Sequence, residues 1–192
     1  MKIGLFFGSF NPIHIGHLII ANHLVEHTDL LEVWFVVTPH NPHKKKSTLL
    51  DDYQRLHMVR LATESYHKIK GSDIEFKLPQ PNYTIHTLAH LEDKFPQHEF
   101  SLIMGADNLS QIHSWKNGDL LLERYSIYVY PRVQDTDINR GAYPTSVHWV
   151  DAPIIELSAT QIRSMLREGK NIRPLVPLEV FDYLEKNAFY RK

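Results

Sequence analysis

The first 27 residues hold the pattern that most constrains the fold of this 192-residue chain. The apolar run Lys2–Phe7 has the composition of a buried strand, Gly8–His17 has the glycines and proline of a turn, and Leu18–Val25 is long and apolar enough for a helix. Successive strand–turn–helix units build a parallel sheet. The first amides of a helix point outward without partners and its dipole favours negative charge, so the turn predicts a nucleotide phosphate site.

Four residues of this turn are candidate ligands or supports for that phosphate. Gly8 would let the backbone approach a ligand where a Cβ would intrude, with Ser9 beside it, and His14 and His17 would place two imidazoles next to the anion. The turn is neither a P-loop nor a G-x-G-x-x-G fingerprint. Glycine turns are ordinary in α/β proteins, so a purely structural turn with incidental histidines is the alternative.

The remainder of the chain alternates strands with helices, which predicts one Rossmann-like, doubly wound α/β domain over residues 1–192. Its mostly parallel sheet should carry helices on both faces, with a C-terminal helical part from about residue 157. Hydrophobic content of 43% and charged content of 22% suit a globular core.

Arg55 and Arg60 are expected on the solvent side of their helix. The expected strands are 31–37, 72–76, 100–104, 125–130 and 146–150, and the expected helices are 51–62, one capped by Thr84, one from Ser158, and 176–184.

Polar residues follow several of the expected strands, at the edge where ligands of parallel sheets gather. Lys44 is a candidate triphosphate contact, although a solvated loop face is the commoner fate of a lysine run. Gly105 and Asp107 suit a ribose hydroxyl, or Asp107 caps a helix instead. Trp115 lies in a polar run without an obvious core role and could stack on an aromatic ring. Arg132 suits a phosphate.

A second candidate phosphate site lies at Ser158–Gln161, which has the sequence of a capping box. The Ser158 hydroxyl would accept the amide of Gln161, whose side chain would reach back. Arg163 and Arg167 share one face of the helix that follows, and Gly169 is a suitable stop. A well-capped surface helix without a ligand is the alternative.

Composition excludes several function classes. The net charge of −1 gives no attraction to nucleic acid or to an anionic membrane, the absence of cysteine excludes disulfides and thiolate chemistry, and no apolar run reaches membrane-spanning length. A cytoplasmic location is therefore expected. His23/His27 and His86/His90 are spaced four apart, as metal ligands can be, but surface histidines are the preferred interpretation and no metal site is predicted. The oligomeric state stays open, and a homo-oligomer is compatible with the sequence.

Six segments, in order along almost the whole chain, resemble motifs of the bacterial nicotinate-nucleotide adenylyltransferases. Gly8–His17 is similar to the H-x-G-H signature of the nucleotidyltransferase superfamily, and Ile155–Arg163 is similar to its I-S-x-T-x-I-R element. Between them lie the matching segments Pro39–Lys44, Asn82–Thr84, Met104–Asp107 and Ser114–Trp115.

The resemblance implies transfer of the adenylyl group of ATP to nicotinate mononucleotide, giving deamido-NAD and pyrophosphate, with Mg²⁺ carried in by the triphosphate. It implies catalytic roles for His14, His17, Lys44 and Arg163. The implied ATP-binding set is Gly8, Ser9, Phe10, His17, Gly105, Asp107, Ser158, Thr160 and Arg163, and the implied acceptor-binding set is Tyr83, Thr84, Trp115 and Arg132.

Alternatives to this assignment remain at the sequence level. The acceptor could be nicotinamide mononucleotide, phosphopantetheine or a cytidylyl-transfer substrate, or the chain could be a nucleotide-sensing or RNA-binding module without catalysis. Tyr83 could equally be a lid over the core. Tyr83 and Trp115 favour a flat aromatic acceptor but do not separate a carboxylate from an amide on its ring.

Overall fold

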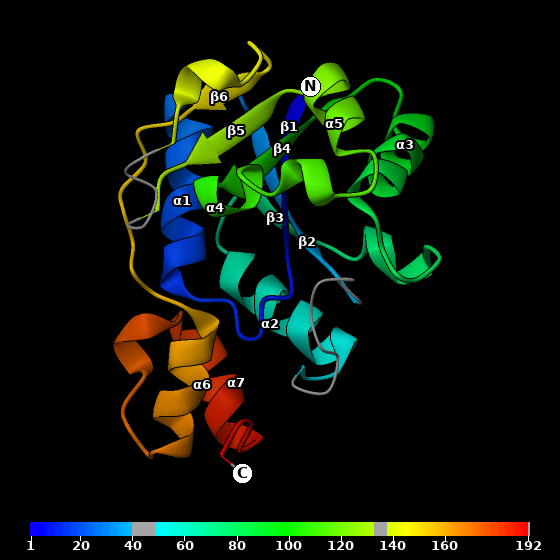
Figure 1. Cartoon of the computed structure of the whole chain (residues 1–192). Coiled ribbons are helices and arrows are strands. Elements are labelled where there is room, and N and C mark those ends of the chain that lie inside the picture. Colours follow the sequence, from blue (N-terminus) through cyan, green and yellow to red (C-terminus); the bar gives the residue numbers. More distant parts are fainter. Residues whose placement is uncertain (40–48, 133–137, 192) are drawn as a thin grey trace.

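A six-stranded, entirely parallel sheet organises the chain (Figure 1), in a computed structural model that describes residues 1–39, 49–132 and 138–191. Its strand order is β3-β2-β1-β4-β5-β6, so the direction of winding reverses between β1 and β4. The predicted Rossmann-like, doubly wound fold is confirmed. The strands are β1 (Lys2–Gly8), β2 (Glu32–Val37), β3 (Ile69–Ser72), β4 (Glu99–Gly105), β5 (Ile127–Tyr130) and β6 (Val147–Trp149).

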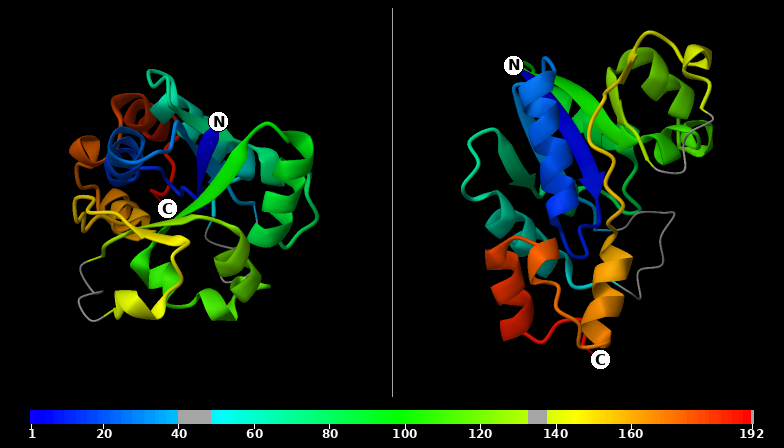
Figure 2. Two further views of the ribbon diagram at one scale, coloured as in Figure 1. Left: turned by 90° about the horizontal axis from the view of Figure 1, so that it is seen from above. Right: turned by 90° about the vertical axis from the view of Figure 1, so that its left-hand side faces the viewer.

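Helices cover both faces of this sheet (Figure 2), because alternate strand residues point to opposite sides. Ile3 and Leu5 of β1 pack with α3, α4 and α5, while Phe6 packs with α1 and α2 on the other face. The α-helices are α1 (Ile15–His27), α2 (Asp52–Thr63), α3 (Thr84–Lys94), α4 (Ala106–Leu109), α5 (Gly118–Arg124), α6 (Ala159–Arg167) and α7 (Leu178–Lys186).

The two C-terminal helices lie beyond the carboxyl ends of the strands (Figure 1). Ile162 and Leu166 of α6, and Val180 and Leu184 of α7, are buried in the same hydrophobic cluster as Phe6. Gly169 has a left-handed φ of +68° after α6, which agrees with its predicted role as a stop. The C-terminal helices therefore border the sheet edge where the candidate ligand-binding residues end.

Three local predictions about these elements are wrong. Residues 72–76 are not a strand: the short edge strand ends at Ser72 and Ile74–Lys77 forms a 3₁₀ turn, which lets the Glu75 carbonyl accept a hydrogen bond from Asn82. Helix α3 begins at Thr84 itself, so Tyr83 and not Thr84 is its N-cap. Helix α1 begins at Ile15, three residues before the expected Leu18, and so includes His17.

The prediction that Arg55 faces solvent is also wrong, although Arg60 on the same helix is exposed as expected. Arg55 is 0% exposed and is the largest fully buried side chain among the described residues. Its guanidinium finds hydrogen-bond acceptors on three backbone segments that converge at the start of α2, so the charged group is paired inside the core.

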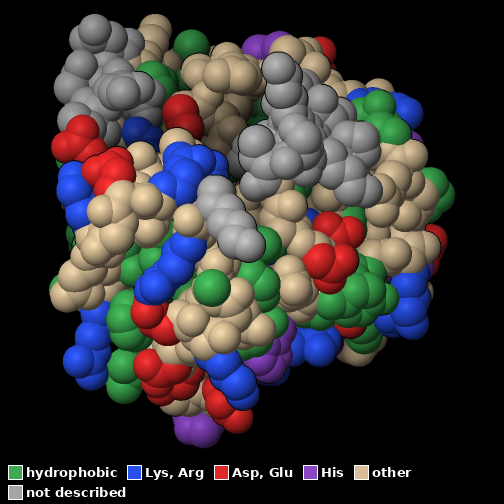
Figure 3. Space-filling view, turned by 90° about the horizontal axis from the view of Figure 1, so that it is seen from below, with side chains coloured by type: hydrophobic (Ala, Val, Ile, Leu, Met, Phe, Trp, Pro, Cys, Tyr) green, Lys and Arg blue, Asp and Glu red, His purple; other side chains and the backbone are tan. Residues whose placement is uncertain are grey.

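Within residues 1–39, 49–132 and 138–191, no helix has the length and apolar composition needed to span a membrane. The face of the molecule seen in Figure 3 carries Lys and Arg next to Asp and Glu, and shows no broad field of one charge.

Candidate active site

A cavity of about 620 Å³ opens at the carboxyl ends of β1 and β4. These two strands flank the point where the winding of the sheet reverses, which is where open α/β sheets bind their ligands. Four groups of residues line the cavity: strand-end residues, the turn after β1, the segment before α3 with the loop before α5, and the start of α6. Residues far apart in the sequence thus meet at one site.

The two histidines of the turn lie at the N-terminus of α1. His14 is the N-cap residue and His17 is the third residue of the helix, and their rings stack with centroids 3.7 Å apart. The backbone N–H of His14 donates to Nδ1 of His17 over 3.2 Å. An accepting Nδ1 leaves the ring proton of a neutral His17 on Nε2, so His17 can donate one hydrogen bond from that atom.

His14 is buried, with 6% of its surface exposed. Burial, and secondarily the positive charge of Arg132, lowers the pKa of His14 from 6.5 to about 4. His14 is therefore neutral at physiological pH. Both histidines line the cavity, and the neutral His14 ring can still donate one hydrogen bond to a phosphate without carrying a charge of its own.

Gly8 lines the cavity as predicted, but the structure gives a different reason for a glycine there. A Cβ at Gly8 would lie 2.8 Å from the ring of Phe10, which folds back over it. Phe10 itself has a φ of 44°, in the left-handed region that non-glycine residues seldom adopt. Gly8 therefore makes room for the buried Phe10 ring, and this packing sets the shape of the turn that carries Ser9.

The N-terminus of α6 forms another part of the cavity wall. The Ser158 Oγ accepts the backbone N–H of Gln161 over 3.2 Å, which is the first half of the predicted capping box; among the described residues no bond back from the Gln161 side chain accompanies it. Arg163 donates from Nη1 to the Asn11 carbonyl over 2.8 Å and from Nη2 to the Thr160 hydroxyl over 3.2 Å. Ser158, Thr160 and Arg163 all line the cavity, whereas Arg167 is exposed.

An aromatic end of the cavity is formed by the segment before α3 and the loop before α5. Tyr83, Thr84 and Trp115, the residues expected to bind the acceptor, line it. Both aromatic rings are half-buried and also pack against the hydrophobic core, so Trp115 has the core contact that its polar neighbours concealed. Lys116, which sequence reasoning missed, lines the same end with its Nζ 4.5 Å from the centre of the Tyr83 ring.

Arg132 reaches the cavity from the end of β5. Its guanidinium lies over the Tyr130 ring, 5.3 Å from the centre, and its Nε lies 3.8 Å from the Asp107 carboxylate. Gly105 and Asp107 are not among the residues that line the cavity, and Asp107 adjoins the site through this ion pair. Asp107 lies in the first turn of α4 and does not cap it with its side chain.

The other residues that the sequence offered as phosphate or metal ligands are not among the described residues of this cavity. Lys44 lies outside the described residues. His23 and His27 have ring centres 4.4 Å apart on α1, while His86 and His90 are exposed on α3. Within the part of the chain that the structure describes, no group of three or more histidine, aspartate and glutamate residues is placed to hold a metal ion.

Sequence reasoning missed three buried polar residues at the site: Asn11, Glu75 and Arg55. Asn11 and Glu75 line the cavity, and Arg55 lies directly behind its wall. The Glu75 carboxylate accepts the Thr87 hydroxyl over 2.7 Å, and burial raises its pKa. Asn11 lies within the H-x-G-H segment, but only the structure brings its partners, which come from distant segments, to it.

Comparison with known proteins shows which family has similar sequences. A family model described as cytidylyltransferase-like matches residues 5–165. A probable nicotinate-nucleotide adenylyltransferase of Flavobacterium psychrophilum is 62% identical over 193 residues, covering the whole of both chains. A protein of the same description from Flavobacterium johnsoniae is 61% identical, again over the whole of both chains.

A solved structure shares the fold at low sequence identity. The nicotinic acid mononucleotide adenylyltransferase of Plasmodium falciparum, complexed with NaAD, superimposes with a TM-score of 0.83 at 20% identity. The match covers 98% of this chain and 97% of the other. Two nearly full-length relatives above 60% identity, and a common fold, thus point to one family.

Proposed function

The chain belongs to the nicotinate-nucleotide adenylyltransferase family, and from this premise we propose how its cavity transfers the adenylyl group of ATP to nicotinate mononucleotide, giving deamido-NAD and pyrophosphate. One observation carries the proposal: the N-termini of α1 and α6 meet at a single cavity, and His14, His17 and Arg163 all line it. Two helix dipoles and three phosphate donors suit a site that must hold several phosphates at once.

The reaction needs alignment more than it needs proton transfer. A phosphate oxygen of nicotinate mononucleotide attacks the α-phosphorus of ATP, the bond from that phosphorus to the bridging oxygen breaks, and pyrophosphate leaves with the electron pair. The attacking phosphate is already ionised at neutral pH, so no general base is required. His14 and His17 donate hydrogen bonds to the phosphates and Arg163 supplies fixed positive charge as charge develops on the leaving group.

The aromatic end of the cavity supports a carboxylate-bearing ring in the acceptor. Tyr83 and Trp115 provide faces for a flat ring, and the ammonium group of Lys116 lies beside them. A carboxylate gains a charge-assisted hydrogen bond from such a group, whereas a neutral amide gains less. Lys116 therefore favours nicotinate over nicotinamide mononucleotide, a distinction that the aromatic rings alone cannot make.

We propose that Mg²⁺ enters the site bound to ATP. The ion prefers oxygen ligands and retains several waters, while the groups placed for phosphate here are mainly imidazole and guanidinium N–H donors. This donor set suits the triphosphate itself, which would hold the metal and let it offset the charge of the leaving pyrophosphate. Lys44 remains a candidate contact to that triphosphate.

The surroundings proposed for the reaction follow from its substrates. ATP and a pyridine mononucleotide are small cytoplasmic molecules, so we place the protein in the cytoplasm, acting without nucleic acid or membrane. The interspersed charges of Figure 3 support the absence of a nucleic-acid surface on that face.

The proposal is tested by product analysis. The protein, ATP, Mg²⁺ and nicotinate mononucleotide should yield equal amounts of deamido-NAD and pyrophosphate, identified by mass spectrometry. His17→Ala removes a donor to the phosphates and should lower turnover by about 10²-fold or more, with an unchanged circular dichroism spectrum. ATP binding without either product would support a nucleotide-sensing module instead, and near-normal turnover in His17→Ala would remove His17 from the catalytic residues.

A further inference from the structure

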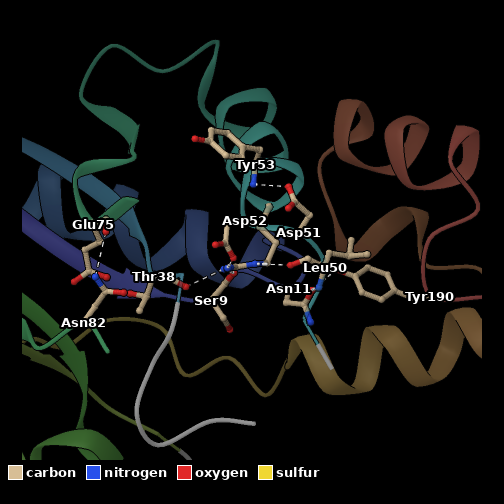
Figure 4. Close-up of polar contacts among 11 residues, drawn as sticks. Ser9, Asn11, Thr38, Leu50, Asp51, Asp52, Tyr53, Glu75, Asn82 and Tyr190 are labelled. Atoms are coloured by element: carbon tan, nitrogen blue, oxygen red, sulfur yellow. Dashed lines mark hydrogen bonds and ion pairs between the residues drawn. The ribbon is translucent and has the colours of Figure 1, made fainter. Parts of the chain in front are cut away.

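The buried guanidinium of Arg55 gathers backbone carbonyls from three segments at the rear of the cavity wall. Its Nη1 donates to the carbonyls of Ser9 over 2.5 Å and of Thr38 over 3.1 Å, and its Nε donates to the Leu50 carbonyl over 3.1 Å. Its Nη2 donates to the Asp52 carboxylate over 2.6 Å, which balances the charge. The dashed lines in Figure 4 mark these contacts around Ser9, Thr38, Leu50 and Asp52.

Each of these carbonyls belongs to a segment that the site depends on. Ser9 is in the phosphate turn, Thr38 follows β2, and Leu50 precedes α2. Buried carbonyls need donors, and arginine offers five N–H groups in a rigid planar fork. A lysine, with one nitrogen, cannot reach three carbonyls and a carboxylate with the same geometry. The positions of the three segments relative to one another therefore depend on a guanidinium at residue 55.

A chain of hydrogen bonds connects Arg55 to Arg163. Leu50, whose carbonyl Arg55 holds, donates its own backbone N–H to the Asn11 Oδ1 over 3.1 Å. The Asn11 carbonyl in turn accepts Nη1 of Arg163 over 2.8 Å. The Tyr190 hydroxyl donates to the same Oδ1 from the C-terminal end of the chain, which fixes the Asn11 side chain from a second direction. We call the chain Arg55–Leu50–Asn11–Arg163 the arginine relay.

We propose that Arg55 is a positioning residue for adenylyl transfer: through the arginine relay it sets the place of Asn11 and thereby the orientation of the Arg163 guanidinium in the cavity. Arg55 itself touches no substrate in this account. The inference rests on the proposed function, because the reaction supplies its assay. An error of about 1 Å in a phosphate-binding group can cost about 10²-fold in rate, so a relay that holds Arg163 in place affects turnover directly.

A double-mutant cycle tests the relay. Arg55→Lys, Arg163→Met and the double variant are compared with the wild type by kcat for pyrophosphate release at saturating ATP and nicotinate mononucleotide. Arg55→Lys should lower kcat about 10-fold or more in the wild-type background but less than about twofold when Arg163 is already absent. Equal fold-losses in both backgrounds, or an unchanged kcat in Arg55→Lys, would overturn the relay.

Arg60 provides the matched control on the same helix. Its guanidinium is exposed and forms an ion pair with Asp73 over 3.3 Å. Arg60→Lys should leave kcat within about twofold of the wild type, because exposed pairs contribute little. A large loss in Arg60→Lys would show that the assay responds to any arginine-to-lysine change on α2, and would also overturn the assignment to Arg55.

A second variant keeps the test decisive if Arg55→Lys does not fold. Asn11→Ala interrupts the relay but leaves the contacts of Arg55 with Ser9, Thr38 and Leu50 in place. The effect of Asn11→Ala on kcat should again nearly vanish in the Arg163→Met background. If the double variant instead shows the product of the two single fold-losses, the relay is refuted. If the wild type releases no pyrophosphate, the proposed function fails, and the same cycle measured as the Kd for ATP with Mg²⁺ decides the relay separately.

Discussion

At the scale of single residues, burial decides the state in which His14 works. The ring is enclosed beside Arg132, and both the loss of water and the neighbouring cation oppose a second positive charge. Its role as a neutral donor therefore holds over the physiological pH range. In the proposed reaction Arg163 supplies the permanent positive charge, so hydrogen bonding and charge neutralisation come from different residues.

The lowered pKa of His14 predicts a pH dependence of stability. The pKa is about 4 in the folded protein and 6.5 in the unfolded chain, so the unfolded chain binds more protons between these values. The free energy of unfolding should therefore fall as the pH drops from about 6.5 to about 4, by about 3 kcal/mol in all. Urea unfolding of the wild type and His14→Asn at several pH values measures this, since the variant lacks the contribution.

The exposed residue His90 is the control for that measurement. His90→Asn should keep the pH slope of the wild type. A His14→Asn variant that also kept the wild-type slope would contradict the account of a buried, neutral His14.

Lys116 carries the residue-scale prediction about specificity. Lys116→Met should lower the preference for nicotinate over nicotinamide mononucleotide, measured as the ratio of kcat/KM values, by about 10-fold, since a hydrogen bond to a charged group contributes about 1.5–3 kcal/mol. Lys94→Met is the control, because Lys94 lies over the ring of Phe95, 5.4 Å from its centre, away from the cavity lining. An unchanged ratio in Lys116→Met would exclude Lys116 as the group that distinguishes the two rings.

At the scale of elements, helix N-termini do most to define the site. Ser158 caps α6 and lines the cavity, whereas Asp51 caps α2, accepting the Tyr53 N–H over 2.9 Å, and is not among the cavity residues. Ser158→Ala and Asp51→Ala should each lower the free energy of unfolding by about 1 kcal/mol. Only Ser158→Ala should also raise the KM for ATP. Equal effects on KM in both variants would show that the cap acts through stability alone.

Elements with a strong hydrophobic period could be predicted from the sequence, and those fixed by distant partners could not. The strands β1, β2 and β4 stand out because most of their residues are apolar. The 3₁₀ turn at residues 74–77 depends on Asn82 and Thr87, which hold Glu75 from a later segment. The early start of α1 is a local exception: His14 stacks on His17 only three residues away, outside the apolar run at Leu18–Val25 on which the prediction rested.

At the scale of the whole molecule, one hydrophobic cluster joins the sheet to the C-terminal helices. Phe6 and Phe35 of the strands share it with Ile162 of α6 and Val180 of α7. We therefore propose that residues 1–192 unfold as a single domain. Differential scanning calorimetry should show one transition with equal calorimetric and van't Hoff enthalpies, and two resolved transitions would contradict a common core.

Some residues of the candidate site could likewise be predicted from local motifs, and others depend on contacts between distant segments. His14, His17, Ser158 and Arg163 lie in compact motifs, so they could be predicted as site residues from the sequence alone. Arg55 has the helical spacing of a solvent-facing residue, and only the convergence of three chain segments makes its burial favourable. The arginine relay crosses from α2 to α6, and such a path is a property of the assembled fold.

The measurement that tests the central claim most directly is pyrophosphate release from ATP and Mg²⁺, with nicotinate mononucleotide and nicotinamide mononucleotide compared side by side. The account predicts rapid release with the nicotinate form and much slower release with the nicotinamide form. Equal use of both acceptors would contradict the role of the Lys116 end of the cavity. No release with either acceptor would contradict adenylyl transfer to a pyridine nucleotide altogether.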